Sequence, residues 1–186
     1  MSIRKWVIIS SVILLIVVMF VSAIMYTSPK KHDLSLPAVI YQLGEQNKQY
    51  EQQVTLNIKG ELKKSLLGKL TFTGEIDIEG ESIPVPKEKR SLVLKFDRQG
   101  QDDLFYRYND RGAPKHFAYG SIFVNKDFTE LTITKYHDED EQYKHEAWSS
   151  DSGYMISAPA YNRSEALTLS KKLMKHYTQQ NKVELQ

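Results

Sequence analysis

The chain opens with an uninterrupted apolar run from Trp6 to Tyr26, "WVIISSVILLIVVMFVSAIMY", which contains no charged residue. As a helix this run rises about 31 Å, close to the thickness of a bilayer's hydrocarbon core. A helix satisfies its own backbone polar groups in lipid, so the pattern predicts a transmembrane helix over residues 6–26. Trp6 and Tyr26 stand at its ends, where amphipathic rings favour the membrane–water boundary.

The same run can also be interpreted as a secretory signal. Arg4 and Lys5 provide a short positive start, and Val21-Ser22-Ala23 resembles a small-residue cleavage site with the cut after its last residue. The apolar run is longer than a typical signal core, which favours an uncleaved anchor. A short basic tail before a first span usually stays inside. We therefore predict a cytoplasmic tail over residues 1–5, a single pass through the cell membrane and a C-terminal domain outside.

Residues 27–52 show no clear periodicity. They begin with the polar stretch "TSPKKHDLSLP" and continue into a glutamine-rich segment. Pro37 suits the first position of a short helix, although Gly44 weakens that interpretation. We predict that this segment is a linker or stalk that lifts the following domain off the lipid, with a short helix as the alternative.

From residue 53 onward the dominant hydrophobic period is two, which is typical of strands with one buried face. The clearest case is "LTFTGEIDI" (residues 70–78), where Gly74 falls on the apolar face and marks a bulge or a close backbone approach. Similar alternation recurs around residues 54–58, 92–96, 104–108, 122–124, 131–133 and 154–156. Turn signals separate these runs at Glu79-Gly80, at 98–100, at 109–112 and at 125–127. Pro84 and Pro86 make "IPVP" a poor or edge strand.

The chain returns to helical spacing in "NRSEALTLSKKLMKHYTQQ". Asn162 can cap this helix and Glu165 can bond back toward it, so we predict one C-terminal helix over residues 163–180. Its apolar face is formed by Ala166, Leu169, Leu173 and Tyr177, widened by Ser170 and Met174. The predicted fold class is α+β, mostly β: a transmembrane helix, then an antiparallel meander (barrel or sandwich) over an extracytoplasmic domain of residues 53–186, with the C-terminal helix packed on it.

Charge and cysteine content narrow the function classes. The chain has 25 Lys and Arg against 23 Asp and Glu, and two of the bases, Arg4 and Lys5, precede the apolar run. The remainder is balanced in charge, which argues against nucleic acid as a partner. The absence of cysteine excludes a disulfide framework, a thiolate metal site and a lipid-modified cysteine anchor.

Two stretches hold candidate chemistry. Metal-ligand types gather in "HDEDEQYKHE", namely His137, Asp138, Glu139, Asp140, Glu141, His145 and Glu146. This run lacks the glycine of a calcium loop and a His-x-x-x-His pair, so a solvated hairpin tip is the simpler interpretation. Aromatic and basic residues alternate in "LFYRYNDRGAPKHFAYGSIF", namely Phe105, Tyr106, Tyr108, Phe117, Tyr119 and Phe123 with Arg107, Arg111, Lys115 and His116. Such a set can form a sugar- or peptide-binding face, but core packing of the aromatics is the more ordinary interpretation.

Three segments together resemble a known group: "LTFTGEIDIEG", "YGSIFVNKDFTELTI" (residues 119–133) and "GYMISAPAYNRSEALTLSKKLM" (residues 153–174). With the apolar run, they are similar to uncharacterised single-anchor extracytoplasmic proteins of Bacillus-like Gram-positive bacteria. The resemblance implies the cell type and the anchored layout. It carries no functional residue, because that group has no assigned activity.

No catalytic, cofactor-binding or metal residue is assigned from the sequence. It contains no Gly-x-Ser-x-Gly elbow and no glycine-rich phosphate loop. The predicted function is a membrane-anchored extracytoplasmic binding or regulatory module whose partner is another envelope protein, a peptide or a cell-wall ligand. The alternatives are an enzyme with an unrecognised active site and a structural subunit of a membrane complex. The sequence argues against an enzyme more than for one.

Overall fold

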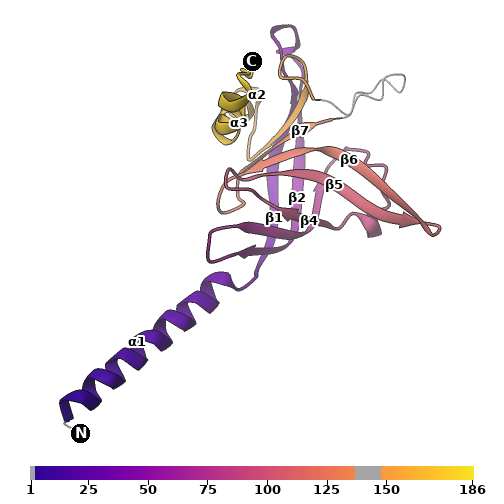
Figure 1. Cartoon of the computed structure of the whole chain (residues 1–186). Coiled ribbons are helices and arrows are strands. Elements are labelled where there is room, and N and C mark those ends of the chain that lie inside the picture. The colour runs from indigo at the N-terminus through magenta and orange to yellow at the C-terminus, as the bar shows by residue number, and fades with distance from the viewer. Residues whose placement is uncertain (1–2, 137–147) are drawn as a thin grey trace.

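A computed structural model describes residues 3–136 and 148–186 of the chain. One long helix, α1 (Ile3–Thr27), leads into a β-rich body that carries short helices on one side (Figure 1). Within α1, residues Ser10–Thr27 have a mean hydropathy of 2.3, and none of them is buried against the rest of the chain. This helix is long and apolar enough to span a membrane, as the sequence predicts, and a signal sequence has the same properties.

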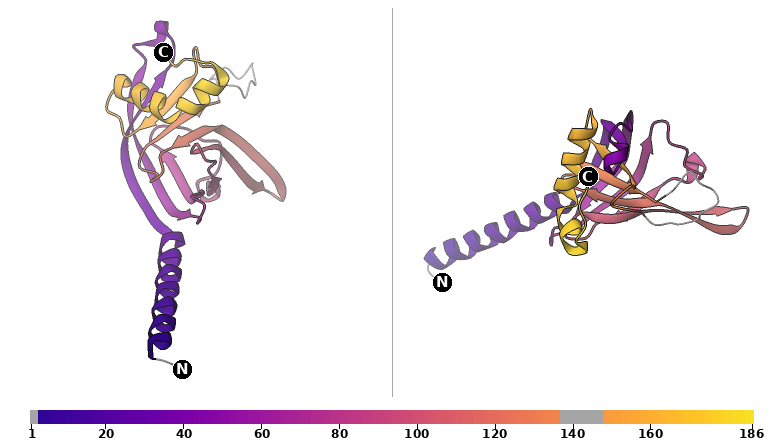
Figure 2. Two further views of the ribbon diagram at one scale, coloured as in Figure 1. Left: turned by 60° about the vertical axis from the view of Figure 1, so that its left-hand side comes forward. Right: turned by 90° about the horizontal axis from the view of Figure 1, so that it is seen from above.

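The strands form one antiparallel sheet of eight, in the order β4-β3-β2-β1-β8-β7-β6-β5. They are β1 (Lys30–Gln42), β2 (Glu51–Lys64), β3 (Leu70–Ile78), β4 (Leu92–Lys95), β5 (Gln101–Asp110), β6 (Ala113–Val124), β7 (Leu131–Lys135) and β8 (Tyr154–Ala158). The edge strands β4 and β5 are consecutive, and the Asp97 N–H donates to the Gln101 carbonyl at 3.0 Å in the turn between them. The sheet is therefore a nearly closed barrel (Figure 2), which confirms the predicted meander.

The prediction of a stalk over residues 27–52 is wrong for most of its length. Residues Lys30–Gln42 form β1, which pairs with β2 along one edge and with β8 along the other. A helix from Pro37 is equally wrong; the short helical turn of this region, a 3₁₀ turn, lies at Glu45–Asn47. β1 follows α1 after Ser28 and Pro29, so the barrel begins directly at the end of the apolar helix.

Pro37 is tolerated inside β1 because of where its missing N–H would point. The Pro37 carbonyl accepts the Ala160 N–H at 3.0 Å, on the β8 side of the strand. In an antiparallel strand the N–H and C=O of one residue point to the same side, so proline removes no bond from the β1–β2 ladder. The pairing of β1 with β8 starts two residues later, at Val39.

Two glycines are paired across the neighbouring strands β2 and β3. Gly60 pairs with Gly74, and the Phe72 ring lies beside both. A Cβ on Gly74 would stand 2.2 Å from the Lys59 carbonyl oxygen and 2.6 Å from the Gly60 Cα. This confirms the close backbone approach predicted for Gly74, and it explains why both strands need glycine here.

Phe128 fills one end of the barrel interior. This residue of the β6–β7 turn is completely buried, and its ring centroid lies 4.8 Å from that of Phe72 and 5.6 Å from that of Phe96. The ring of His32 on β1 is also close, at 5.8 Å. We call this the α1 end of the barrel; it comprises the turns 65–69, 97–100 and 125–129, which gather beside Tyr26 of α1.

The C-terminal segment packs on the outer face of the sheet, against β1, β7 and β8 (Figures 1 and 2). Asn162 caps α2 (Arg163–Leu173) by accepting the Glu165 N–H at 3.0 Å, as predicted. The prediction of one continuous helix over 163–180 is wrong, because the helix is interrupted at Met174 and a second helix, α3 (Lys175–Asn181), follows. At this interruption the Met174 side chain joins a buried cluster with Val39, Tyr41 and Met155. Leu173 and Tyr177 are only half-buried.

Candidate functional site

The candidate site lies on the ribbon formed by β5 and β6. The two strands pair from Gln101 opposite Phe123 to Asp110 opposite Ala113, with one register shift at Leu104/Phe105. Side chains alternate along β5, so Leu104 and Tyr106 point into the barrel while Arg107 and Asn109 are exposed outside. The distal half of the ribbon extends beyond the barrel wall as a free arm (Figure 1).

An aromatic and cationic stack covers the outer face of this ribbon. The rings of Phe105 and His116 are stacked with centroids 5.5 Å apart and 16° between their planes. The guanidinium carbon of Arg107, which pairs with His116 across the ribbon, lies 5.0 Å from the Phe105 ring centroid. Phe105 is half-buried, while Arg107 and His116, which lie against its ring, are exposed.

A shallow, open hollow of about 640 Å³ adjoins the stack. Its lining is formed by Phe105, Arg107, Tyr108, Asn109, Pro114, Lys115 and His116. At the ribbon's tip the Lys115 ammonium lies 2.6 Å from the Asp110 carboxylate, and this contact holds the pKa of Asp110 below its usual range. Arg107 and Arg111 add positive charge along the outer face and at the tip. Asp103, at the barrel end of the same face, is negative and accepts a hydrogen bond from the Ser121 hydroxyl at 2.7 Å. The surface therefore suits an anionic ligand with an apolar or planar part.

The inner face of the ribbon is structural. Tyr106 and Tyr119 are almost completely buried, and burial raises the pKa of Tyr106 to about 12. The Tyr119 hydroxyl donates to the Glu81 carboxylate at 3.0 Å, and Lys135 lies 2.8 Å from the same group. Burial, followed by the Glu81 charge, raises the pKa of Tyr119, so this phenol stays neutral and keeps donating.

Residues 79–91 connect β3 to β4, and hydrogen bonds from Arg90 hold this segment in place. Arg90 donates to the carbonyls of Val85 and Ile83 at 2.8 and 2.9 Å, and it lies 3.4 Å from the Asp77 carboxylate. Ile83 and Val85 are both buried in the barrel core, although the segment is not a strand. The prolines of "IPVP" correctly exclude a central strand, and Arg90 satisfies the carbonyls of its two buried aliphatic residues.

Sequence reasoning missed a cluster of buried hydroxyl groups between α2 and the sheet. Ser170 Oγ of α2 lies 2.7 Å from both Tyr41 Oη and Thr132 Oγ1, and 2.8 Å from Ser157 Oγ. All four side chains are fully buried, and burial raises the pKa of Tyr41 to about 12. The hydroxyls satisfy one another and fix α2 on the sheet, so we interpret the cluster as a helix-docking contact.

The sequence candidates divide in three ways. Of the aromatic set, Tyr106, Tyr119 and Phe123 belong to the core, whereas Phe105 stands on the outer face with Arg107 and His116. The metal candidates of residues 137–146 lie outside the described residues. Among the described residues no group of three His, Asp or Glu side chains is arranged to hold a metal ion.

Sequence reasoning also missed the contribution of Asn109 and Pro114 to the hollow. They share a ribbon face with Phe105 and His116, since all four follow the period of two along paired strands. The sequence predicts this shared face only if the turn at residues 111–112 is known to join β5 and β6 as a hairpin. Comparison with known proteins supplies no relative: no protein-family model, curated protein or solved structure matches this chain.

Proposed function

We propose that the chain is a membrane-tethered extracytoplasmic binding module that holds an acidic segment of another envelope protein on the outer face of the β5–β6 ribbon. The observation that carries this proposal is the stack of His116 and Arg107 on Phe105. Aromatic and arginine side chains are among the residue types that dominate the binding energy of protein interfaces. The positive charges of Arg107 and Arg111 favour a partner that presents carboxylates.

The anchored layout supports the same role. In the proposal α1 stays in the cell membrane of a Gram-positive bacterium, residues 1–5 lie in the cytoplasm and the barrel lies outside. A short basic tail before the first span and a long folded domain after it are consistent with that orientation. A ribbon that projects from a tethered barrel reaches other envelope proteins without releasing the module from the bilayer.

Orientation is tested by labelling from outside. The chain has no cysteine, so Ala113→Cys at the exposed tip of the ribbon introduces a single thiol. We expect this thiol to react with a membrane-impermeant maleimide on intact protoplasts, because the barrel faces the exterior. Labelling only after lysis would contradict the orientation. Appearance of the labelled domain in the culture fluid would instead indicate that the apolar helix is cleaved.

Partner binding is tested by photo-crosslinking in native membranes. A photoreactive residue at the exposed position Asn109 is expected to give one dominant adduct, whereas the same residue at the exposed position Asn57 of β2 is expected to give none. Arg107→Glu should weaken the partner's apparent affinity by about tenfold or more, since an arginine at the centre of an interface typically contributes over ~1.4 kcal/mol.

Lys59→Glu on the exposed face of β2 is the matched charge reversal, and the Asn109 adduct should survive it. The same adducts at positions 109 and 57, or an adduct that persists with Arg107→Glu, would refute the ribbon as the binding face. An adduct with wall carbohydrate in place of a protein would refute the proposed protein partner and identify the ligand as a carbohydrate.

A further inference from the structure

Apolar side chains protrude from the turn between β2 and β3. The sequence here is "KKSLLGK", from Lys63 to Lys69, and the side chains of Leu66 and Leu67 are 68% and 96% exposed. The Ser65 N–H donates to the Lys69 carbonyl at 2.8 Å, and the Gly68 N–H donates to the Ser65 carbonyl at 2.9 Å. Gly68 has a φ of 77°, the left-handed conformation that glycine adopts without strain. The turn is therefore closed by its own backbone bonds and presents both leucines outward.

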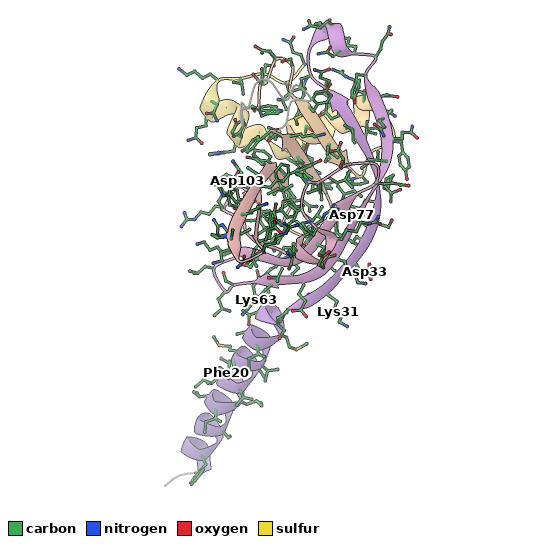
Figure 3. All side chains as sticks on the ribbon, turned by 90° about the vertical axis from the view of Figure 1, so that its right-hand side faces the viewer. Phe20, Lys31, Asp33, Lys63, Asp77 and Asp103 are labelled. Carbon is green, nitrogen blue, oxygen red and sulfur yellow. The ribbon has the colours of Figure 1, made fainter. Side chains whose placement is uncertain are left out.

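This leucine turn lies beside the end of α1. Lys30, the first residue of β1, pairs with Leu62, and β2 continues two residues beyond that pair, about 7 Å back toward α1. A hollow of about 460 Å³ is lined jointly by Tyr26 of α1 and Gly68 of the turn, together with the other turns of the α1 end. Figure 1 shows the β2–β3 turn next to the C-terminal end of α1, and Figure 3 places Lys31 and Lys63 at the same junction.

The charge around the leucine turn is positive. Lys63 and Lys69 are exposed on its two sides, and residues 62–69 contain no acid. The neighbouring turns of the α1 end expose Arg98 and Lys126 beside Asp97 and Asp127, so they add no net charge. The positive excess at this end therefore comes from the lysines of the leucine turn itself. Exposed leucines flanked by lysines are the combination that binds the interface of an anionic bilayer, because the apolar groups enter the boundary while the cations face the headgroups.

We infer that the α1 end of the barrel rests on an anionic bilayer, with Leu66 and Leu67 inserted into its interface and Lys63 and Lys69 at the headgroups. The inference rests on the proposed anchoring by α1, which places this end of the barrel at the lipid surface. A second contact beside the anchor restricts rotation of the barrel about α1. The β5–β6 ribbon is then held in a fixed orientation to the membrane, which favours engagement of a partner in that membrane.

The test uses the full chain in vesicles, with an environment-sensitive NBD label on a single cysteine and lipids that carry a quencher in the upper acyl chain. With Leu67→Cys we expect blue-shifted NBD emission and strong quenching in vesicles that contain phosphatidylglycerol. Ala113→Cys, on the ribbon tip, is the matched exposed position and should show aqueous emission without quenching. Lys63→Gln combined with Lys69→Gln should reduce the quenching at position 67.

Val17→Cys, in the middle of the apolar stretch of α1, separates this inference from the anchor. Quenching at position 17 by deep quenchers, with aqueous emission at position 67, would overturn the bilayer contact alone. Aqueous emission at position 17 would overturn both the anchor and the contact. Equal quenching of position 67 in phosphatidylcholine vesicles with and without phosphatidylglycerol would overturn the role of the lysines.

Discussion

Replacing Phe128 by alanine is expected to lower the free energy of unfolding of the barrel by about 3–5 kcal/mol. The ring is completely buried at the α1 end and packs against Phe72, Phe96 and His32, so its removal leaves a cavity lined by three other rings. The corresponding drop in melting midpoint is roughly 10 °C for a domain of this size. Thermal or urea unfolding of the full chain in detergent measures both quantities.

The backbone at this position makes a second prediction about the same residue. Phe128 has a φ of 56°, in the left-handed region that costs a non-glycine residue about 1–2 kcal/mol. Phe128→Gly loses the ring but relieves that strain, so we expect it to be at least as stable as Phe128→Ala. At an ordinary position the order is reversed, because glycine loses more conformational entropy on folding.

Leu67→Ala is the matched control for Phe128, since Leu67 is almost fully exposed. In detergent its effect on the free energy of unfolding should stay within about 0.5 kcal/mol. An equally small effect of Phe128→Ala would show that the ring does not hold the end of the barrel together. A glycine variant clearly less stable than the alanine variant would contradict the left-handed backbone at residue 128.

Alternation predicted every strand except β1, where apolar residues cover both faces. Residues 70–78 were readable because threonine and acidic residues face solvent between the buried Leu70, Phe72, Ile76 and Ile78. In β1 the residues 38–41 are all buried, since Ala38 and Ile40 face the barrel interior while Val39 and Tyr41 lie under the C-terminal helices. A short apolar run of this kind next to a proline has no period to detect, so the segment resembles a linker.

The candidate site was predictable in its residue types but not in its division between core and surface. Phe105 and Tyr106 are adjacent and chemically alike, yet one stands in the outer stack and the other is buried. The division depends on which face of β5 meets the barrel interior, and that is set by pairing with β6 across the turn at 111–112. The hydroxyl cluster was unreadable for a similar reason, because its members come from β1, β7, β8 and α2.

The C-terminal helix shows how a correct pattern can still misplace a core residue. Its apolar spacing continues smoothly from Ala166 to Tyr177, and nothing in the sequence marks a break. In the structure Met174 has a φ of −90° and a ψ of 7°, which ends α2 and redirects the chain into α3. Met174 becomes fully buried, and Leu173 moves to the margin of the contact.

Met174→Asp should consequently destabilise the domain far more than Leu173→Asp. A carboxylate at position 174 is buried in the apolar cluster that contains Val39, Tyr41 and Met155, so we expect a loss of about 3–5 kcal/mol. At position 173 the carboxylate can turn toward water, and the expected loss is roughly 1–2 kcal/mol. Gln179→Asp on the exposed side of α3 is the control, with an effect within about 0.5 kcal/mol.

Trp148 provides a local measurement of the same change. Its ring centroid lies 6.3 Å from that of Tyr177, so it reports whether α3 stays docked. In a Trp6→Phe background, Met174→Asp should shift the Trp148 emission to longer wavelength at temperatures where the Gln179→Asp protein is unchanged. If both aspartate variants at 173 and 174 destabilise the domain equally, the turn at Met174 does not direct that side chain into the core, and the docking of the C-terminal helices on β1 and β8 is contradicted.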